Sequence, residues 1–169
     1  RSTLFPYTTL FRSRSRTFQL QCAWDGGKNS SRLNIVKEAG LDYQTEKGLS
    51  FADNLTKAGI SGSGSTFSTL KAAIAQVLSN DEGSCVAIAN EVGTAKIANP
   101  FSAGDVSYVE SPYSYNSIAD FRDNIRSIRN VWLGSTNETA NQYSFHTFFA
   151  SVQNDAVNQK VERAYASAI

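Results

Sequence analysis

The sequence predicts an all-α protein built as a helical bundle. Apolar residues recur every three or four positions in several stretches, which is the period of a helix with one buried face. No stretch of useful length alternates apolar and polar residues as a half-buried strand does. Helices that each carry one apolar stripe bury those stripes against one another, so a bundle is the expected arrangement.

The first sixteen residues are expected to be foreign to the natural protein. Residues 3–13 read TLFPYTTLFRS, which resembles the conceptual translation of an adapter used in DNA sequencing. A foreign segment of this kind carries no information about the natural fold. We therefore predict that residues 1–16 are adapter-derived and disordered. Residues 17–169 are expected to be a fragment of a helical domain whose N-terminal half is missing.

Shorter helices are predicted before residue 100. Residues 31–39 and 50–59 each begin near a capping serine and end at or beside a glycine. Residues 66–78 carry one apolar face, and the Gly/Ser-rich stretch before them, residues 59–65, is expected to be a flexible linker. The apolar period resumes over residues 85–100. Gly83 lies between, so one bent helix and two separate helices both fit.

Two strong amphipathic helices are predicted after Gly104. The first covers residues 117–133, with a capping box formed by Ser117 and Asp120 and a stop at Gly134. The second runs from residue 144 to the end of the chain. Packing decides whether the first helix forms, because each buried apolar side chain contributes roughly 1.5–3 kcal/mol. Its apolar residues are spaced three and four apart: Ile118, Phe121, Ile125, Ile128 and Trp132.

The charge of the chain excludes an obvious nucleic-acid footprint. There are 16 Lys and Arg against 15 Asp and Glu. Four of the arginines lie in residues 1–16, which leaves 12 basic against 15 acidic residues and a net charge of −3. No Lys/Arg run remains to neutralise phosphates, so we expect no nucleic-acid partner. No apolar run approaches the roughly 20 residues of a membrane-spanning helix.

The residues that most often carry chemistry are scarce. Cys22 and Cys85 lie far apart in sequence, which favours free thiols and leaves a disulfide possible in an oxidising compartment. The only histidine is His146, and the positions three and four residues later hold Phe149 and Ala150. A metal-binding helix would need a second ligand there. We predict no catalytic residue and no metal ligand in this sequence.

A strip of polar residues along the helix at 117–133 has two interpretations. Asn116, Ser117, Asp120 and Asn124 recur at the helix start or at helical spacing and could form a hydrogen-bonding strip. Alternatively they cap the helix and face solvent, with Asp123 and Arg126 as an ion pair. Spacing alone favours capping and a solvated face.

Residues 84–134 resemble the imelysin family, also called insulin-cleaving metalloproteinase-like proteins. The resemblance lies in SCVAIANEVGTAKIANPF and in VESPYSYNSIADFRDNIRSIRNVWLGS. It is specific over residues 88–96 and 113–134 and loose before residue 65. It implies an all-helical fold of two bundle-like halves with a cleft between them. It also implies an exported bacterial protein, periplasmic or attached to the outer membrane, that acts in iron uptake.

The family's signature Gly-x-His-x-x-Glu is absent here and is expected in the missing N-terminal half. The resemblance implies binding of a metal or haem rather than catalysis, with iron or another divalent metal as a possible cofactor of the full-length protein. Two alternatives remain: a metallopeptidase whose site lies in the missing half, and a plain helical interaction module. Six residues match positions of family-like motifs and are candidate cleft residues: Glu91, Lys96, Asn116, Ser117, Asp120 and Asn124.

Overall fold

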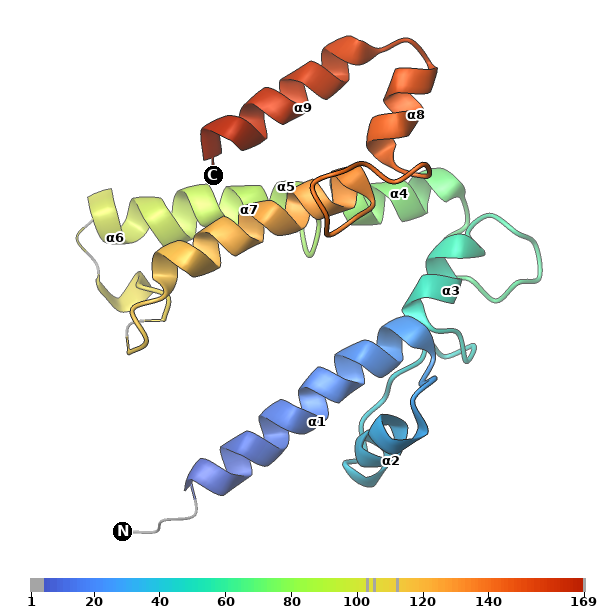
Figure 1. Ribbon diagram of the computed structural model, residues 1–169. Helices are drawn as coiled ribbons and strands as arrows, with labels where there is room; N and C mark the ends of the chain where they lie inside the picture. The colour runs from blue at the N-terminus through green and yellow to red at the C-terminus, as the bar shows by residue number, and fades with distance from the viewer. Residues whose placement is uncertain (1–4, 103, 105, 112, 169) are drawn as a thin grey trace. The chain divides into compact units, whose positions relative to one another are not determined.

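The computed structural model describes residues 5–102, 104, 106–111 and 113–168, and every regular element in these ranges is a helix (Figure 1). The all-α prediction is therefore confirmed. The chain divides into two units, Arg1–Ile74 and Ala75–Ile169. None of the helices in the described ranges has the length and apolar character needed to span a bilayer.

The first unit has a small core where its longest helix meets two short ones. Helix α1 (Phe5–Asp25) packs against α2 (Ser30–Glu38) and α3 (Phe51–Thr56). Cys22 and Val36 are 1% and 0% exposed and form the centre of this contact. Helices α2 and α3 occur where the sequence predicts them. Each begins at a side-chain cap, Asn29 for α2 and Ser50 for α3.

The start of α1 differs from the expected disorder, because residues 5–16 are helical. Pro6 lies in the first turn, where proline is tolerated, and no later glycine or proline interrupts the helix. Several of the residues 10–16 make hydrogen bonds or a cation–π contact within α1, as in the 3.0 Å hydrogen bond from Ser15 Oγ to the Phe11 carbonyl. The helix at these positions is thus locally stabilised. Their adapter origin stays a prediction.

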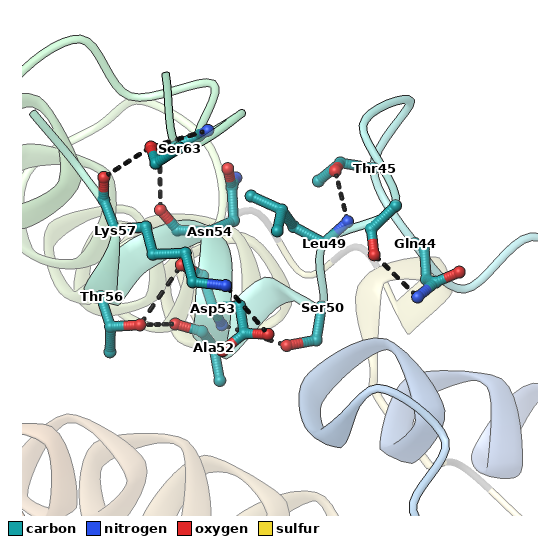
Figure 2. Close-up of polar contacts among 12 residues, drawn as sticks. Gln44, Thr45, Leu49, Ser50, Ala52, Asp53, Asn54, Thr56, Lys57 and Ser63 are labelled. Carbon is teal, nitrogen blue, oxygen red and sulfur yellow. Dashed lines mark hydrogen bonds and ion pairs between the residues drawn. The ribbon is translucent and has the colours of Figure 1, made fainter. Parts of the chain in front are cut away.

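The Gly/Ser-rich stretch after α3 is a hydrogen-bonded loop rather than a flexible linker. Asn54 is 3% exposed, and its Nδ2 donates to Thr66 Oγ1 at 2.8 Å. The Thr66 amide donates back to Asn54 Oδ1, also at 2.8 Å. Ser63 Oγ donates to the Lys57 carbonyl at 3.1 Å (Figure 2). Buried Asn54 therefore holds the end of the loop against α3, and the bond of Ser63 to Lys57 attaches its middle.

Helix α4 (Leu70–Leu78) begins later than the predicted residue 66. The Thr69 hydroxyl accepts a hydrogen bond from the Ala72 amide at 3.1 Å and so marks the helix start. Thr66 is already bonded to Asn54, which places it in the loop.

After α4 the chain breaks and then forms one long helical stretch. Gly83 has φ 67°, so the alternative with two helices is correct. Ser84 caps α5 (Cys85–Glu91) by accepting from the Ala87 amide at 3.1 Å. The stretch continues through the π-helix η1 (Val92–Ala98) into α6 (Asn99–Ser102).

Helix α7 (Ser117–Leu133) has the predicted bounds, and it ends at Gly134 with φ 61°. The predicted capping box is wrong. The N-cap is Asn116, which makes no side-chain cap. Ser117 Oγ instead donates to the Glu110 carbonyl, and the Asp120 carboxylate accepts from Ser111 Oγ. Both side chains are used to attach the preceding loop.

The single helix predicted from residue 144 to the end is two helices, α8 (Phe145–Ser151) and α9 (Asp155–Ala168) (Figure 1). Gln153 has φ 57°, and the chain reverses there. The turn lets α9 pack against both α8 and α7. Asn158 of α9 is 5% exposed, and its Nδ2 donates to the His146 carbonyl at 3.1 Å. This tertiary packing outweighs the helical period that continues across the turn.

The core of the second unit lies where α7 meets α8. Trp132 is 8% exposed and stacks on Phe145 and Phe149, with ring centroids 6.2 and 5.5 Å apart. Aromatic pairs in this range add about 0.5–1.5 kcal/mol to the burial of their area. Trp132 therefore anchors the C-terminal helices to α7.

Candidate functional site

The π-helix places a glutamate and a lysine side by side. Glu91 is the last residue of α5, and Lys96 lies in η1. Hydrogen bonds from residue i to i+5 widen the turn, so residues five apart come to the same side. Lys96 Nζ is 3.5 Å from Glu91 Oε1. Short π-helical turns are rare and often occur at functional sites.

A second glutamate completes this contact from a loop that is distant in sequence. Lys96 Nζ donates to Glu110 Oε1 at 3.2 Å. The exposed fractions of the side chains are 18% for Lys96, 37% for Glu110 and 59% for Glu91. The pair of Lys96 with Glu110 is shorter and less exposed than the pair of Lys96 with Glu91, so water screens it less. Glu110 therefore holds the lysine more firmly than Glu91 does. The other oxygen, Glu110 Oε2, is buried and has no hydrogen-bond partner within the described ranges.

The two carboxylates keep Lys96 charged. Burial by itself lowers the pKa of the ammonium group. The hydrogen bond and negative charge of Glu110, with a further contribution from Glu91, outweigh burial and raise the pKa of Lys96 above its ordinary value. The lysine thus acts as a fixed positive charge rather than as a base near neutral pH.

The loop that carries Glu110 is fastened to the first turn of α7. Ser117 Oγ donates to the Glu110 carbonyl. Ser111 Oγ donates to Asp120 Oδ2 at 2.5 Å. We call the connected group the Lys96 cluster. Its three carboxylates and one ammonium carry a net charge of −2, and its members are Glu91, Lys96, Glu110, Ser111, Ser117 and Asp120.

Four of the six candidate residues from the sequence lie in the Lys96 cluster: Glu91, Lys96, Ser117 and Asp120. The other two lie outside it. Asn116 is exposed and makes no side-chain cap. Asn124 lies one turn beyond Asp120, and its carbonyl accepts from Ser127 Oγ at 2.7 Å.

The sequence reasoning missed Glu110 and Ser111. One signal could have found Glu110, because it and Asp105 are the only acidic residues in the connection at 99–116. The expected ion pair of Asp123 with Arg126 is present at 3.3 Å on the solvated part of α7.

Large, exposed apolar side chains occur close in sequence to residues of the Lys96 cluster, on elements at the same end of the second unit. Helix α6 packs against η2 (Val106–Tyr108), and the start of α7 lies at the same end (Figure 1). We call these residues the apolar rim. They and their exposed fractions are Phe101 (91%), Tyr113 (97%), Tyr115 (92%) and Ile118 (78%).

The residues of the Lys96 cluster do not by themselves fit a metal ion. Two of its carboxylates are already paired with the ammonium of Lys96. Within the described ranges no group of three or more His, Cys, Asp or Glu side chains is arranged to hold a metal. His146 lies elsewhere, with its Nε2 donating to Glu162 Oε1 at 3.2 Å. The cluster is therefore suited to orienting a polar ligand rather than to metal chemistry.

The two cysteines are free thiols. Cys22 is buried and Cys85 is half-buried, and burial is the largest cause of the raised pKa of each thiol. Neither thiol is activated as a nucleophile, because a reactive cysteine needs a lowered pKa.

The chain matches the model of a known protein family. A family model described as Imelysin matches residues 31–169, which is most of the chain and includes the Lys96 cluster and the apolar rim. No curated protein and no solved structure matches the chain.

Proposed function

This chain belongs to the imelysin family, and we propose that it is the ligand-binding part of an exported protein that acts in iron or haem uptake, without being a catalyst itself. One observation carries the binding function: the apolar rim and a half-buried charged cluster lie at the same end of the second unit. Exposed apolar patches bordered by polar groups are typical of binding surfaces. The periplasmic or outer-membrane location is part of the same proposal and rests on the family alone.

Haem is the cargo whose chemistry best matches this surface. It offers a broad apolar face for Phe101 and Ile118, which are 91% and 78% exposed. Phenol oxygens are among the protein ligands of haem iron, and Tyr113 and Tyr115 are 97% and 92% exposed. Both tyrosines lie between Ser111 and Ser117, and hydrogen bonds of the Lys96 cluster attach this loop to the start of α7.

A hemin titration tests this proposal. We expect the full chain to bind hemin saturably, with a shift of the Soret band. Replacing both rim tyrosines, Tyr113→Ala and Tyr115→Ala, should weaken binding at least about tenfold, since two anchoring aromatic residues are lost. Tyr143→Ala is the matched control, because Tyr143 is 86% exposed and lies outside the rim. Equal loss in the control, or no saturable binding, would contradict the proposal.

A metallopeptidase is the rival function within the same family. The Gly-x-His-x-x-Glu pattern is not in this sequence, since Ser144 and Phe149 occupy the corresponding positions around His146. Because the peptidase alternative places this motif outside this sequence, the test needs a protein that contains both this chain and the motif. Incubated with an unfolded protein substrate and a divalent metal, such a protein should give no cleavage. Cleavage that a chelator blocks would favour the peptidase.

A helical interaction module is a second candidate that the apolar rim also favours. Rim residues covered by another protein would explain their exposure in the chain alone. Light scattering with size-exclusion chromatography separates the two functions. A self-association that the rim substitutions abolish, in the absence of hemin binding, would favour the interaction module.

A further inference from the structure

A pocket outside the Lys96 cluster lies between α7, the connection after it and α9. Its volume is about 420 Å³, within the range of roughly 300–1,000 Å³ that small-molecule sites occupy. Trp132, Leu133 and Ala166 supply apolar surface. Four of its seven lining residues carry polar groups, namely Arg129, Glu138, Glu162 and Tyr165. Placed beside an apolar wall, such groups can fix the orientation of a ligand.

Arg129 is the half-buried positive charge of this pocket, and its ion-pair partner Glu138 is exposed and makes only a long contact with it. The Arg129 side chain is 29% exposed, whereas that of Glu138 is 88% exposed. Their single contact, Arg129 Nη1 to Glu138 Oε1, is 3.4 Å long. An exposed carboxylate that makes one long contact contributes little to stability and is easily displaced. A guanidinium can hold a carboxylate through two parallel hydrogen bonds.

Two groups on α9 complete the wall. Burial raises the pKa of Tyr165 to about 12, with a further increase from Cys85 and a smaller opposing effect of Arg129. Tyr165 is therefore a neutral hydroxyl at any ordinary pH. Glu162 is 59% exposed, so water screens its negative charge more than the positive charge of Arg129. His146 Nε2 already donates to Glu162.

We propose that this pocket binds a small amphipathic carboxylate, whose acidic group takes the place of Glu138 on Arg129 and whose apolar body lies against Trp132. The proposal is independent of the haem surface. The ligand class follows from one half-buried guanidinium, that of Arg129, which has a displaceable partner and lies in the same pocket as Trp132.

The test uses 3-phenylpropionate and its neutral analogue 3-phenylpropionamide. The full chain with Trp24→Phe leaves Trp132 as the only tryptophan, so its fluorescence reports on the pocket. We expect the acid to bind at least about tenfold more tightly than the amide, as charged hydrogen bonds provide. Arg129→Gln should abolish this preference. Arg126→Gln is the matched control, because Arg126 is on the same helix and outside the pocket.

Glu138→Gln keeps the test decisive if Arg129→Gln disturbs folding. Glu138 is almost fully exposed, and its replacement frees Arg129 from its competitor. Binding of 3-phenylpropionate should tighten about two- to fivefold, the scale of an exposed ion pair. Unchanged or weaker binding in Glu138→Gln would overturn the proposal. So would equal affinity for the acid and the amide in the Trp24→Phe chain.

Discussion

Replacing Lys96 with methionine should destabilise the second unit, because it leaves Glu110 without its cation. Removing one partner of a fully buried ion pair costs about 3–5 kcal/mol, and an exposed pair contributes about 0.2–1 kcal/mol. The pair of Lys96 with Glu110 lies between these limits, at 18% and 37% exposed. We therefore expect Lys96→Met to lower the free energy of unfolding by about 1–3 kcal/mol.

Denaturant unfolding in the Trp24→Phe chain, followed by Trp132 fluorescence, measures this change in the correct unit. Glu91→Gln is the internal control and should cost at most about 1 kcal/mol, because Glu91 is 59% exposed. In a double-mutant cycle, Glu110→Gln should recover much of the loss caused by Lys96→Met. The reasoning is refuted if Lys96→Met costs no more than Glu91→Gln, or if the cycle shows no coupling between Lys96 and Glu110.

The same pair has a pH dependence of definite sign. The pKa of Lys96 is raised in the folded chain. Its contribution to stability is therefore complete below the unfolded pKa of about 10.4 and is lost as pH rises through the higher folded value. The stability difference between the parent chain and Lys96→Met should shrink above about pH 10.5. A constant difference from pH 8 to 11.5 would show that the charge of Lys96 is not responsible.

Three further substitutions and one deletion test the fold. In a thermal unfolding assay, Gly134→Ala should lower the free energy of unfolding by about 1–2 kcal/mol, since φ is 61° and the new Cβ would lie 3.2 Å from Ser144 Cβ. Gly93→Ala is the control: its new Cβ would lie in open space within η1, so the change should be neutral or slightly stabilising. Asn54→Ala should lower the free energy of unfolding by about 1–3 kcal/mol, because it removes both side-chain hydrogen bonds to Thr66. It should also make residues 59–65 more susceptible to limited proteolysis. Unchanged cleavage would show that these bonds do not hold the loop. Deleting residues 1–16 should change the free energy of chemical unfolding by no more than about 0.5 kcal/mol, because the hydrogen bonds and the cation–π contact shown for residues 11–16 are made within α1. A larger loss would mean that the natural domain begins earlier.

Local sequence signals predicted the helices well wherever a cap or a glycine marked an end. The bounds of α7 follow from its apolar spacing and from Gly134, which adopts the left-handed conformation that a helix stop requires. The bounds of α7 depend on neighbours in sequence, so a single chain is enough to show them. At Gly83 the sequence left one bent helix and two helices both open, and the left-handed φ of 67° in the structure decides for two.

Tertiary contacts explain the predictions that failed. The turn at Gln153 interrupts an apolar period that looks continuous, and only the packing of α9 against α7 and α8 shows why it forms. The hydroxyl of Ser117 has the expected position for a cap but bonds to the Glu110 carbonyl instead. Spacing along one helix cannot indicate which of several nearby acceptors a hydroxyl will use.

Only the part of the candidate site that depends on neighbours in sequence could be predicted. Glu91 and Lys96 belong to one continuous helical stretch, and Ser117 and Asp120 to another, so motif matching could find each pair. Glu110 connects the two pairs from a loop that has no periodic pattern. Its role depends on the contact with Lys96 across fourteen positions, which only the folded chain reveals.

Hydrogen exchange with and without hemin tests the central claim most directly, namely that the end of the second unit formed by the Lys96 cluster and the apolar rim is the ligand-binding surface. The account predicts slower exchange on hemin addition in peptides covering residues 92–120. It predicts no change in peptides covering residues 129–166, which contain the separate pocket. Protection confined to residues 129–166, or protection nowhere, would contradict the claim.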